Sequence, residues 1–274
     1  MSPVPLPRLR GLVLGVAGAL ACVRALAVPG LGSDLIPNFF GVGAGSTSQF
    51  SGSAQSVVGV VPGLRYKFEG SERFVEWYGP LADANVLNSR EWQFGPALNL
   101  RFGRSDVDDA VVARLPDVDN TIEGGIALSY TYVDPGPIPF RLRVGGLALV
   151  DLGDTFHGFD DTVYASLWMP LSRTMLLGLG TGASWASTSY TQAYYGVTPA
   201  GAQASGLPAY TPGSGMRQWY AWPALVVQVA PSWFVGTAAF YQRLVGDAAA
   251  SPIVQQRGDR NQWTYGIGLG YAWR

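Results

Sequence analysis

The chain ends in WTYGIGLGYAWR, residues 263–274, where large apolar side chains alternate with glycine, alanine and threonine. A β-strand directs successive side chains to opposite faces, so this segment predicts a strand with one bulky apolar face and one small face. In a soluble sandwich the second face would carry charged residues facing water. The segment therefore favours a strand that faces lipid on one side and a crowded lumen on the other.

The length of such segments supports a membrane setting. The same alternation recurs at 56–68, 91–104 and 120–133. Ten steps from Trp92 to Phe102 give roughly 33 Å of strand at about 3.3 Å per residue. A tilt of about 40° reduces this to roughly 25 Å, the height of the apolar band on outer-membrane barrels. Strands of soluble proteins average only about 5–6 residues.

The full pattern predicts an all-β fold, a transmembrane antiparallel up-and-down β-barrel of about 12 strands. The expected strands are 36–47, 56–68, 71–80, 82–88, 91–104, 120–133, 138–151, 160–171, 173–188, 217–230, 232–245 and 261–274. The links between these strands are largely short and long in turn, as expected for periplasmic turns and outer loops. The link near residue 81 is an exception, since it is short where a long one is expected. Four strands alternate poorly: 71–80, 82–88, 160–171 and 232–245. Pro62, Pro96 and Pro223 lie inside expected strands and indicate either bulges or misplaced strands.

Composition agrees with this fold. The 274 residues are 48% hydrophobic and only 14% charged, against about 25% charged in typical soluble domains. After residue 27 no apolar run reaches the 18 residues of a transmembrane helix. A chain that enters lipid without such helices satisfies its backbone hydrogen bonds only as a closed barrel.

The first 27 residues predict a cleaved signal peptide. Arg8 and Arg10 precede an apolar core at 11–23, and Ala25-Leu26-Ala27 forms a small-x-small box, so we expect cleavage after Ala27 and a barrel domain at 28–274. The single Cys22 would leave with the leader; acylation there is disfavoured by Leu20. Removing three arginines from 18 basic residues leaves 15 against 19 acidic residues, a net charge of −4. That balance argues against a nucleic-acid partner.

Several segments resemble the MipA/OmpV family. They include Trp185-Ala186, Ser189-Tyr190, Gln192, Tyr195-Gly196-Val197, Ser205-Gly206-Leu207-Pro208 and Tyr210, followed by Gly246-Asp247-Ala248-Ala249 and Ser251-Pro252-Ile253-Val254. Upstream, Phe94-Gly95-Pro96, Arg101-Phe102-Gly103-Arg104 and the Asp-rich 106–119 segment are similar to the family's middle portion. The likeness covers nearly all the mature chain and is strongest after about residue 170.

The resemblance implies a protein of the outer membrane of Gram-negative bacteria, surrounded by outer-membrane lipid. It implies a structural scaffold that brings a lytic transglycosylase together with a murein synthase at the cell envelope. Other members of the family are linked to osmotic adaptation and adhesion, so a narrow small-solute channel and an adhesin are the alternatives. Many members end on an aromatic residue, whereas this chain ends Trp273-Arg274, so the barrel assembly machinery is expected to depend on Trp273.

Catalytic and metal chemistry are weak expectations. His157 is the only histidine; Asp154, Asp160 or Asp161 are candidates to orient it toward Ser166, but no G-x-S-x-G motif accompanies them. We interpret His157 as a solvated loop residue and expect no enzyme and no cofactor. Calcium is the cation to consider at Asp106, Asp108, Asp109, Asp117 and Asp119, but the spacing is not that of an EF-hand and a solvated loop is the better interpretation.

Two further sets of residues are candidate functional groups. Charges expected in the lumen are Arg65, Lys67, Arg101, Glu123, Arg141 and Arg143, which would either line an anion-selective pore or pair with carboxylates and plug the barrel. We favour plugging. The long loop at 189–216 is the candidate interaction surface, with Tyr190, Gln192, Tyr195, Gly196, Ser205, Gly206, Leu207, Pro208 and Tyr210, and with one short helical turn at Ala200 to Ser205.

Overall fold

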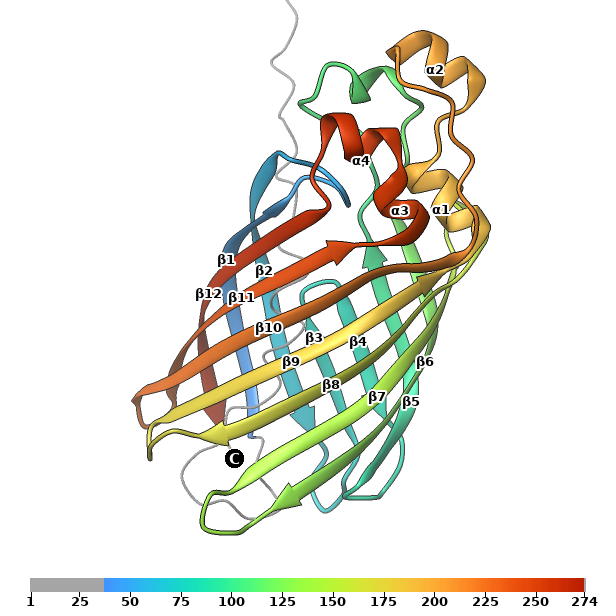
Figure 1. Cartoon of the computed structure of the whole chain (residues 1–274). Helices are drawn as coiled ribbons and strands as arrows, with labels where there is room; N and C mark the ends of the chain where they lie inside the picture. The colour runs from blue at the N-terminus through green and yellow to red at the C-terminus, as the bar shows by residue number, and fades with distance from the viewer. Residues whose placement is uncertain (1–36, 274) are drawn as a thin grey trace, which may run out of the picture.

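The computed structural model describes residues 37–273, which form a closed barrel of twelve antiparallel strands (Figure 1). Each strand pairs with its neighbours in sequence, and β1 closes the barrel against β12. The strands are β1 Asn38–Ser48, β2 Ser56–Lys67, β3 Phe74–Tyr78, β4 Leu81–Asn85, β5 Trp92–Arg101, β6 Thr121–Asp134, β7 Phe140–Asp151, β8 Asp160–Pro170, β9 Met175–Ala186, β10 Gly215–Ala230, β11 Trp233–Leu244 and β12 Asn261–Trp273. All twelve expected strands are confirmed, with ends within three residues of those expected. The expected signal peptide, Cys22 included, lies outside the described residues.

The outward face is apolar, as the alternation predicts. On β12, the side chains of Trp263 and Ile267 are 48% and 60% exposed. Thr264 and Ala272, which point to the other face of the strand, are buried. The same two-residue rhythm of exposure runs along β5 and β6. Exposed aliphatic and aromatic side chains therefore form the lipid-facing belt, because large apolar surfaces on a barrel wall are stable against lipid and not against water.

The inward face differs from the expectation of small or polar residues. Trp168 of β8, Trp222 of β10 and Phe234 and Phe240 of β11 are buried in the lumen as one cluster with Phe39, Tyr78 and others. The Trp168 and Trp222 rings lie 5.7 Å apart. This explains why 160–171 and 232–245 alternate poorly: these strands carry large apolar side chains toward the lipid on one face and toward the cluster on the other. We call this group the lumen aromatic cluster.

The three prolines inside strands lie where a ladder is interrupted. The β2–β3 ladder begins at Gly63, the residue after Pro62, and the β4–β5 ladder includes Ala97 but stops short of Pro96. The β10–β11 ladder skips from Ala221 to Ala224 and so omits Pro223. The strands are therefore correctly placed, since each proline stands where its missing N–H is not required by a neighbouring strand.

One hairpin is much shorter than the rest of the wall. β3 and β4 have five residues each and are joined by Gly79-Pro80, so the hairpin ends part-way up the barrel (Figure 1). β2 pairs with β3 only through Gly63–Lys67, although β2 begins at Ser56. The unexpectedly short link near residue 81 thus marks a real drop in the height of the wall.

The outer end carries a layer of short helices above the strands (Figure 1). It comprises the 3-10 turn η2 Val112–Arg114, α1 Thr188–Tyr195, α2 Pro199–Ser205, α3 Gly246–Ala250 and α4 Pro252–Arg257. α2 confirms the expected helical turn at Ala200 to Ser205, whereas α1 was not expected. Among residues 37–273, no helix is long and apolar enough to cross a membrane.

Candidate functional site

The outer mouth of the barrel is capped by α1. The Ser187 side chain accepts a hydrogen bond from the Tyr190 backbone N–H and begins the helix, while the Gly196 N–H bonds to the Gln192 carbonyl and ends it. A side chain at Gly196 would lie 2.4 Å from that carbonyl, so glycine is required for the close approach. The helix buries Tyr190 and Tyr195 completely and Tyr194 almost completely.

Contacts from distant segments hold α1 in place. The Tyr195 hydroxyl lies 2.7 Å from Ser51 Oγ of the β1–β2 loop, and Ser251 Oγ donates to the Tyr195 carbonyl at 2.7 Å. Tyr190 packs edge-on against Phe156, with ring centroids 4.9 Å apart. The helix is therefore a cap fixed to two loops and to the start of α4, because hydrogen bonds and aromatic packing both anchor it.

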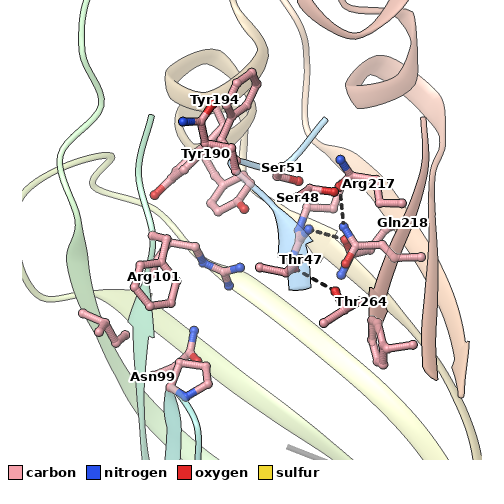
Figure 2. Close-up of a pocket in the computed structure, with 18 residues that line it drawn as sticks. Thr47, Ser48, Ser51, Asn99, Arg101, Tyr190, Tyr194, Arg217, Gln218 and Thr264 are labelled. Carbon is pink, nitrogen blue, oxygen red and sulfur yellow. Dashed lines mark hydrogen bonds between the residues drawn. The ribbon is translucent and has the colours of Figure 1, made fainter. Parts of the chain in front are cut away.

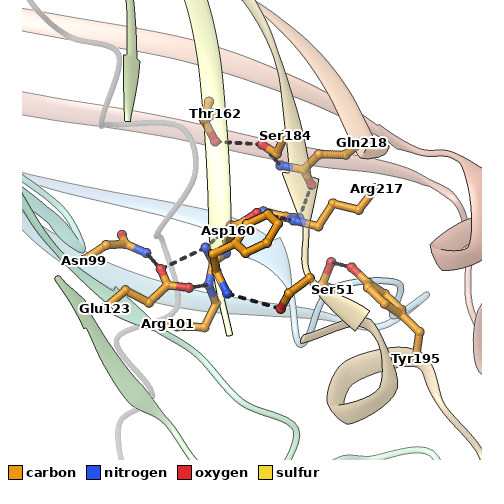
Figure 3. A network of polar contacts seen from close by, with 12 residues as sticks. Ser51, Asn99, Arg101, Glu123, Asp160, Thr162, Ser184, Tyr195, Arg217 and Gln218 are labelled. Carbon is orange, nitrogen blue, oxygen red and sulfur yellow. Dashed lines mark hydrogen bonds and ion pairs between the residues drawn. The ribbon is translucent and has the colours of Figure 1, made fainter. Parts of the chain in front are cut away.

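Directly beneath α1, a polar network spans the lumen from β5 to β10 (Figure 3). Arg101 donates to Glu123 at 3.0 and 2.9 Å and also pairs with Asp160. Arg217 donates twice to Asp160, at 2.8 and 2.7 Å. Further hydrogen bonds extend the network on both sides. Asn99 donates to Glu123 on one side; on the other, Arg217 donates to Gln218, Gln218 donates to Ser184, and the Ser184 and Thr162 hydroxyls bond to each other.

The network is electrically balanced. Its two guanidinium groups face two carboxylates, and all four side chains are buried or nearly so. The guanidinium carbons of Arg101 and Arg217 also lie 5.4 and 5.2 Å from the centre of the Tyr190 ring. Burial raises the pKa of Tyr190 well above its usual value, and likewise that of Tyr194, so both phenols stay neutral. The site therefore offers hydrogen-bonding groups and aromatic faces without net charge.

A cavity of about 210 Å³ lies beside this network (Figure 2). Tyr190 and Tyr194 bound it from the outer side, with Arg101 and Arg217 on opposite flanks. Gln218, Gln262 and Thr264, all buried, contribute amide and hydroxyl groups from β10 and β12. The hydroxyls of Tyr190 and Tyr194 have no hydrogen-bond partner among residues 37–273. Buried polar atoms are normally paired, so these hydroxyls point to a missing polar partner.

Of the charges expected in the lumen, Arg65, Glu123 and Arg143 are buried, the other three are half-buried, and most pair locally. Arg65 bonds to Glu76 at 3.3 Å, Lys67 to Glu72 at 2.8 Å, and Arg143 to Ser129 at 2.8 Å. Arg141 is half-buried on β7. Of the expected set, the structure brings only Arg101 and Glu123 into the network under α1.

Sequence reasoning missed Arg217 and misjudged Asp160. Arg217 lies at a bulge between Met216 and Gln218, where the strand register shifts, so alternation does not predict its direction. Asp160, considered as a partner for His157, instead bonds to Arg101 and Arg217. One feature of the sequence could have indicated the role of Asp160: it is a charged residue at the start of an expected strand, in a chain with few charges.

The residues expected to form an interaction surface divide into two groups. Tyr190, Tyr195, Ser205 and Leu207 are buried, and Ser205 bonds to the Gly201 carbonyl and the Leu207 N–H. Gly206 ends α2 with a φ of 80°, a conformation that favours glycine. The Tyr210 hydroxyl, in turn, donates to the Asp247 carbonyl at 3.0 Å. Gln192 and Pro208 are exposed, and Gln192 and Gly196 border an outer cleft of about 530 Å³.

The catalytic and acidic candidates do not assemble into a site. His157 Nδ1 lies 3.5 Å from Asp154, both side chains are largely exposed, and Ser166 is in β8 where it pairs with Arg143. Asp109 is buried, bonds to Arg257 at 2.8 Å and accepts the Val111 and Val112 amides. Burial raises the pKa of Asp109, but these hydrogen bonds outweigh it and hold the pKa below its usual value. Among the described residues, no three His, Cys, Asp or Glu groups are placed to hold a metal.

Comparisons with known proteins give a family and a set of similar barrels. A family model, MltA-interacting protein MipA, matches residues 40–273. No curated protein matches the chain. Solved structures that resemble it include an outer membrane channel from Pseudomonas putida F1, 12% identical with a TM-score of 0.48, covering 90% of this chain and 98% of that one. They also include the NanC porin, 12% identical with a TM-score of 0.43, covering 86% and 100%, and OmpT of Vibrio cholerae, 8% identical with a TM-score of 0.40, covering 86% and 97%. With its closed twelve-strand wall, its apolar belt and a family match over most of its length, the protein is an outer-membrane β-barrel that belongs to the family of the MltA-interacting protein MipA.

Proposed function

We propose that this barrel is a non-conducting scaffold that binds a murein-processing lytic transglycosylase at its periplasmic rim. The family's name supplies the kind of partner. The observation that carries the proposal is the filling of the lumen: α1 and the polar network occupy the outer mouth, and the lumen aromatic cluster lies within the bore. A solute channel needs a continuous polar path, and these groups oppose one.

The periplasmic rim offers an ordered surface for such a partner. The links β2–β3 and β4–β5 span residues 68–73 and 86–91, which are longer than the two-residue turns expected there. We call them the periplasmic turn pair. The Glu72 N–H donates to Asn88 Oδ1 at 2.7 Å, and Arg73 Nε donates to the Val86 carbonyl at 3.0 Å. These bonds join the two turns, and a surface that is already ordered loses less entropy on binding.

The turn pair carries exposed charges of both signs. Arg90 is 65% exposed at its side chain and lies 3.7 Å from Glu72, and Glu69 and Glu91 are also exposed. Rim charges of this kind contribute to the rate and specificity of association. A partner with a complementary charge pattern would dock against this side of the rim, and the outer cleft and α2 would remain outside the contact.

The test is a binding measurement with the purified lytic transglycosylase of the same organism and the full-length barrel in lipid nanodiscs. We expect Arg90→Glu to weaken binding about tenfold, through reversal of one rim charge, and Arg114→Glu on the exposed outer turn η2 to leave it unchanged. Equal affinity for wild type and both variants would remove the turn pair from the interface. Absence of any binding by wild type would overturn the scaffold proposal.

Conductance separates the scaffold from the channel alternative. In planar bilayers the wild-type barrel is expected to show no stepwise current, whereas reproducible unitary steps would favour a small-solute channel.

The proposal also holds that the chain is not an enzyme. Any lipid hydrolysis in purified samples should therefore be unchanged by His157→Ala, and its loss in that variant would contradict us.

A further inference from the structure

The barrel wall has a notch on one side. Within residues 37–273, Ser56–Val61 of β2 pair with β1 alone, because the β3 ladder reaches only as far as Gly63 and the Gly79 N–H bonds to the Pro62 carbonyl. On the other flank the Leu100 N–H bonds to the Pro80 carbonyl at 2.9 Å, and the chain then leaves the sheet as a loop. We call the space above Gly79-Pro80, between Ser56–Val61 and residues 100–104, the wall notch.

The cavity under α1 reaches this notch. The residues that line it include Tyr190 and Arg217 on the inside and Pro80 and Leu100 at the notch. Leu100 faces outward on β5 and is 38% exposed. Since Leu100 lines the cavity and its side chain faces outward, the cavity reaches the wall at this height.

The outer surface beside the notch is apolar. Val58 is 70% exposed and Val60 40% exposed on one flank, and Leu98 is 51% exposed below the other. Above the notch, the Asp108 N–H bonds to Gln49 Oε1 at 3.1 Å and joins the two flanking loops. The notch is therefore a side opening that faces lipid and is closed over on the outer side.

The inner end of the cavity has the chemistry of a sugar site. Its arginines are neutralised by Glu123 and Asp160, so a charged head group gains little there. The phenol hydroxyls of Tyr190 and Tyr194 lack partners among the described residues, and buried amide groups come from Gln218 and Gln262. At about 30 Å³ per liquid water, 210 Å³ holds about seven waters, the scale of one sugar ring, so the cavity takes the terminal ring of a longer sugar head.

We propose that the cavity binds the uncharged, hydroxyl-rich sugar head of an amphipathic molecule, which enters sideways from the membrane through the wall notch and leaves its acyl chain against Leu100 and Val60. Entry from the lipid explains why a polar cavity opens beneath a fixed cap and beside an apolar surface. The ligand class is a glycolipid. The test must distinguish it from a free sugar that enters from outside the cell.

The test is native mass spectrometry of the full chain, purified in a zwitterionic detergent and incubated with dodecyl maltoside, maltose or dodecylphosphocholine. We expect one dodecyl maltoside per barrel, little retained maltose and no displacement by dodecylphosphocholine. Leu100→Trp, which fills the notch, should lower dodecyl maltoside retention at least tenfold. Leu128→Trp, on the lipid-facing side of β6, is the matched control and should bind as wild type does.

A second variant tests the inner end. Tyr190→Phe keeps the packed ring and removes one hydroxyl, so retention should fall about three- to tenfold, the value of one hydrogen bond. The proposal is overturned if Leu100→Trp retains the glycoside as wild type does, or if maltose binds as tightly as dodecyl maltoside. Displacement by dodecylphosphocholine would overturn the assignment of the head group as a sugar. Heat-dependent mobility on gels confirms that each variant is folded.

Discussion

Asp160 on β8 and Arg217 on β10 form a two-bond ion pair across the intervening strand β9, with N–O distances of 2.8 and 2.7 Å. Asp160 also accepts from Arg101 of β5, three strands away from β8 along the barrel wall. One carboxylate therefore ties together strands that do not pair with each other. Since both guanidinium groups contact the Tyr190 ring, the same carboxylate supports the α1 cap.

We predict that Asp160→Asn lowers the free energy of unfolding by about 3–5 kcal/mol, because Arg217 loses its charge partner in a buried position and Arg101 keeps only Glu123. Urea unfolding of the barrel in lipid vesicles measures the effect. Asp154→Asn is the control, since its side chain is 88% exposed and its removal should cost almost nothing. A loss below about 1 kcal/mol for Asp160→Asn would mean that water reaches the network.

Two changes at Tyr190 should have opposite consequences. Tyr190→Ala removes a fully buried ring between Phe156, Tyr194 and the two arginines, and should cost about 3–5 kcal/mol in the free energy of unfolding. Tyr190→Phe removes only a hydroxyl without a partner among the described residues, so the free energy should change little or rise. The same vesicle unfolding experiment compares them. Equal losses for both would show that the hydroxyl is bonded.

The Asp109–Arg257 pair predicts a pH dependence of the outer loops. Since the pKa of Asp109 is lowered in the folded protein, its stabilisation is complete above the ordinary value of about 3.9 and is lost as the pH falls through the lower folded pKa. Hydrogen exchange at the Val111 and Val112 amides, which bond to Asp109, should accelerate over that acidic range relative to Asp109→Asn. In Asp109→Asn the amides should lack this pH-dependent protection, so their exchange should follow the intrinsic rate at every pH. A constant ratio between the two proteins would contradict the assignment.

Assembly of the barrel in cells should depend on Trp273. This residue is the last of β12, pairs with Asn38 at the closing seam, and its ring lies 5.9 Å from that of Phe40. We expect Trp273→Ala to reduce the folded, heat-modifiable form in outer membranes several-fold, through weaker recognition by the barrel assembly machinery. Trp263→Ala, at the outer end of the same strand, serves as control. Similar losses in both variants would indicate general destabilisation.

Strand placement could be predicted from local sequence because the signal is local. Each strand of a membrane barrel meets lipid on one face along most of its length, so alternation of side chains within about ten residues is sufficient. The α1 helix escaped prediction because it is only eight residues long and its tyrosines are buried by Phe156 and by the arginines of other strands. Poor alternation at 160–171 reflected the lumen aromatic cluster, and not a weak strand.

The sequence alone determined the twelve-strand barrel, its lipid-facing side and the inward direction of Arg101 and Glu123, since a two-residue period sets the face of each side chain. Only the tertiary structure decided that Arg101 meets Asp160 and Arg217, that α1 closes the mouth, and that the short β3–β4 hairpin leaves a notch beside the cavity. These features depend on which strands face each other across the lumen. That arrangement is a property of the closed wall, and no period within a single strand encodes it.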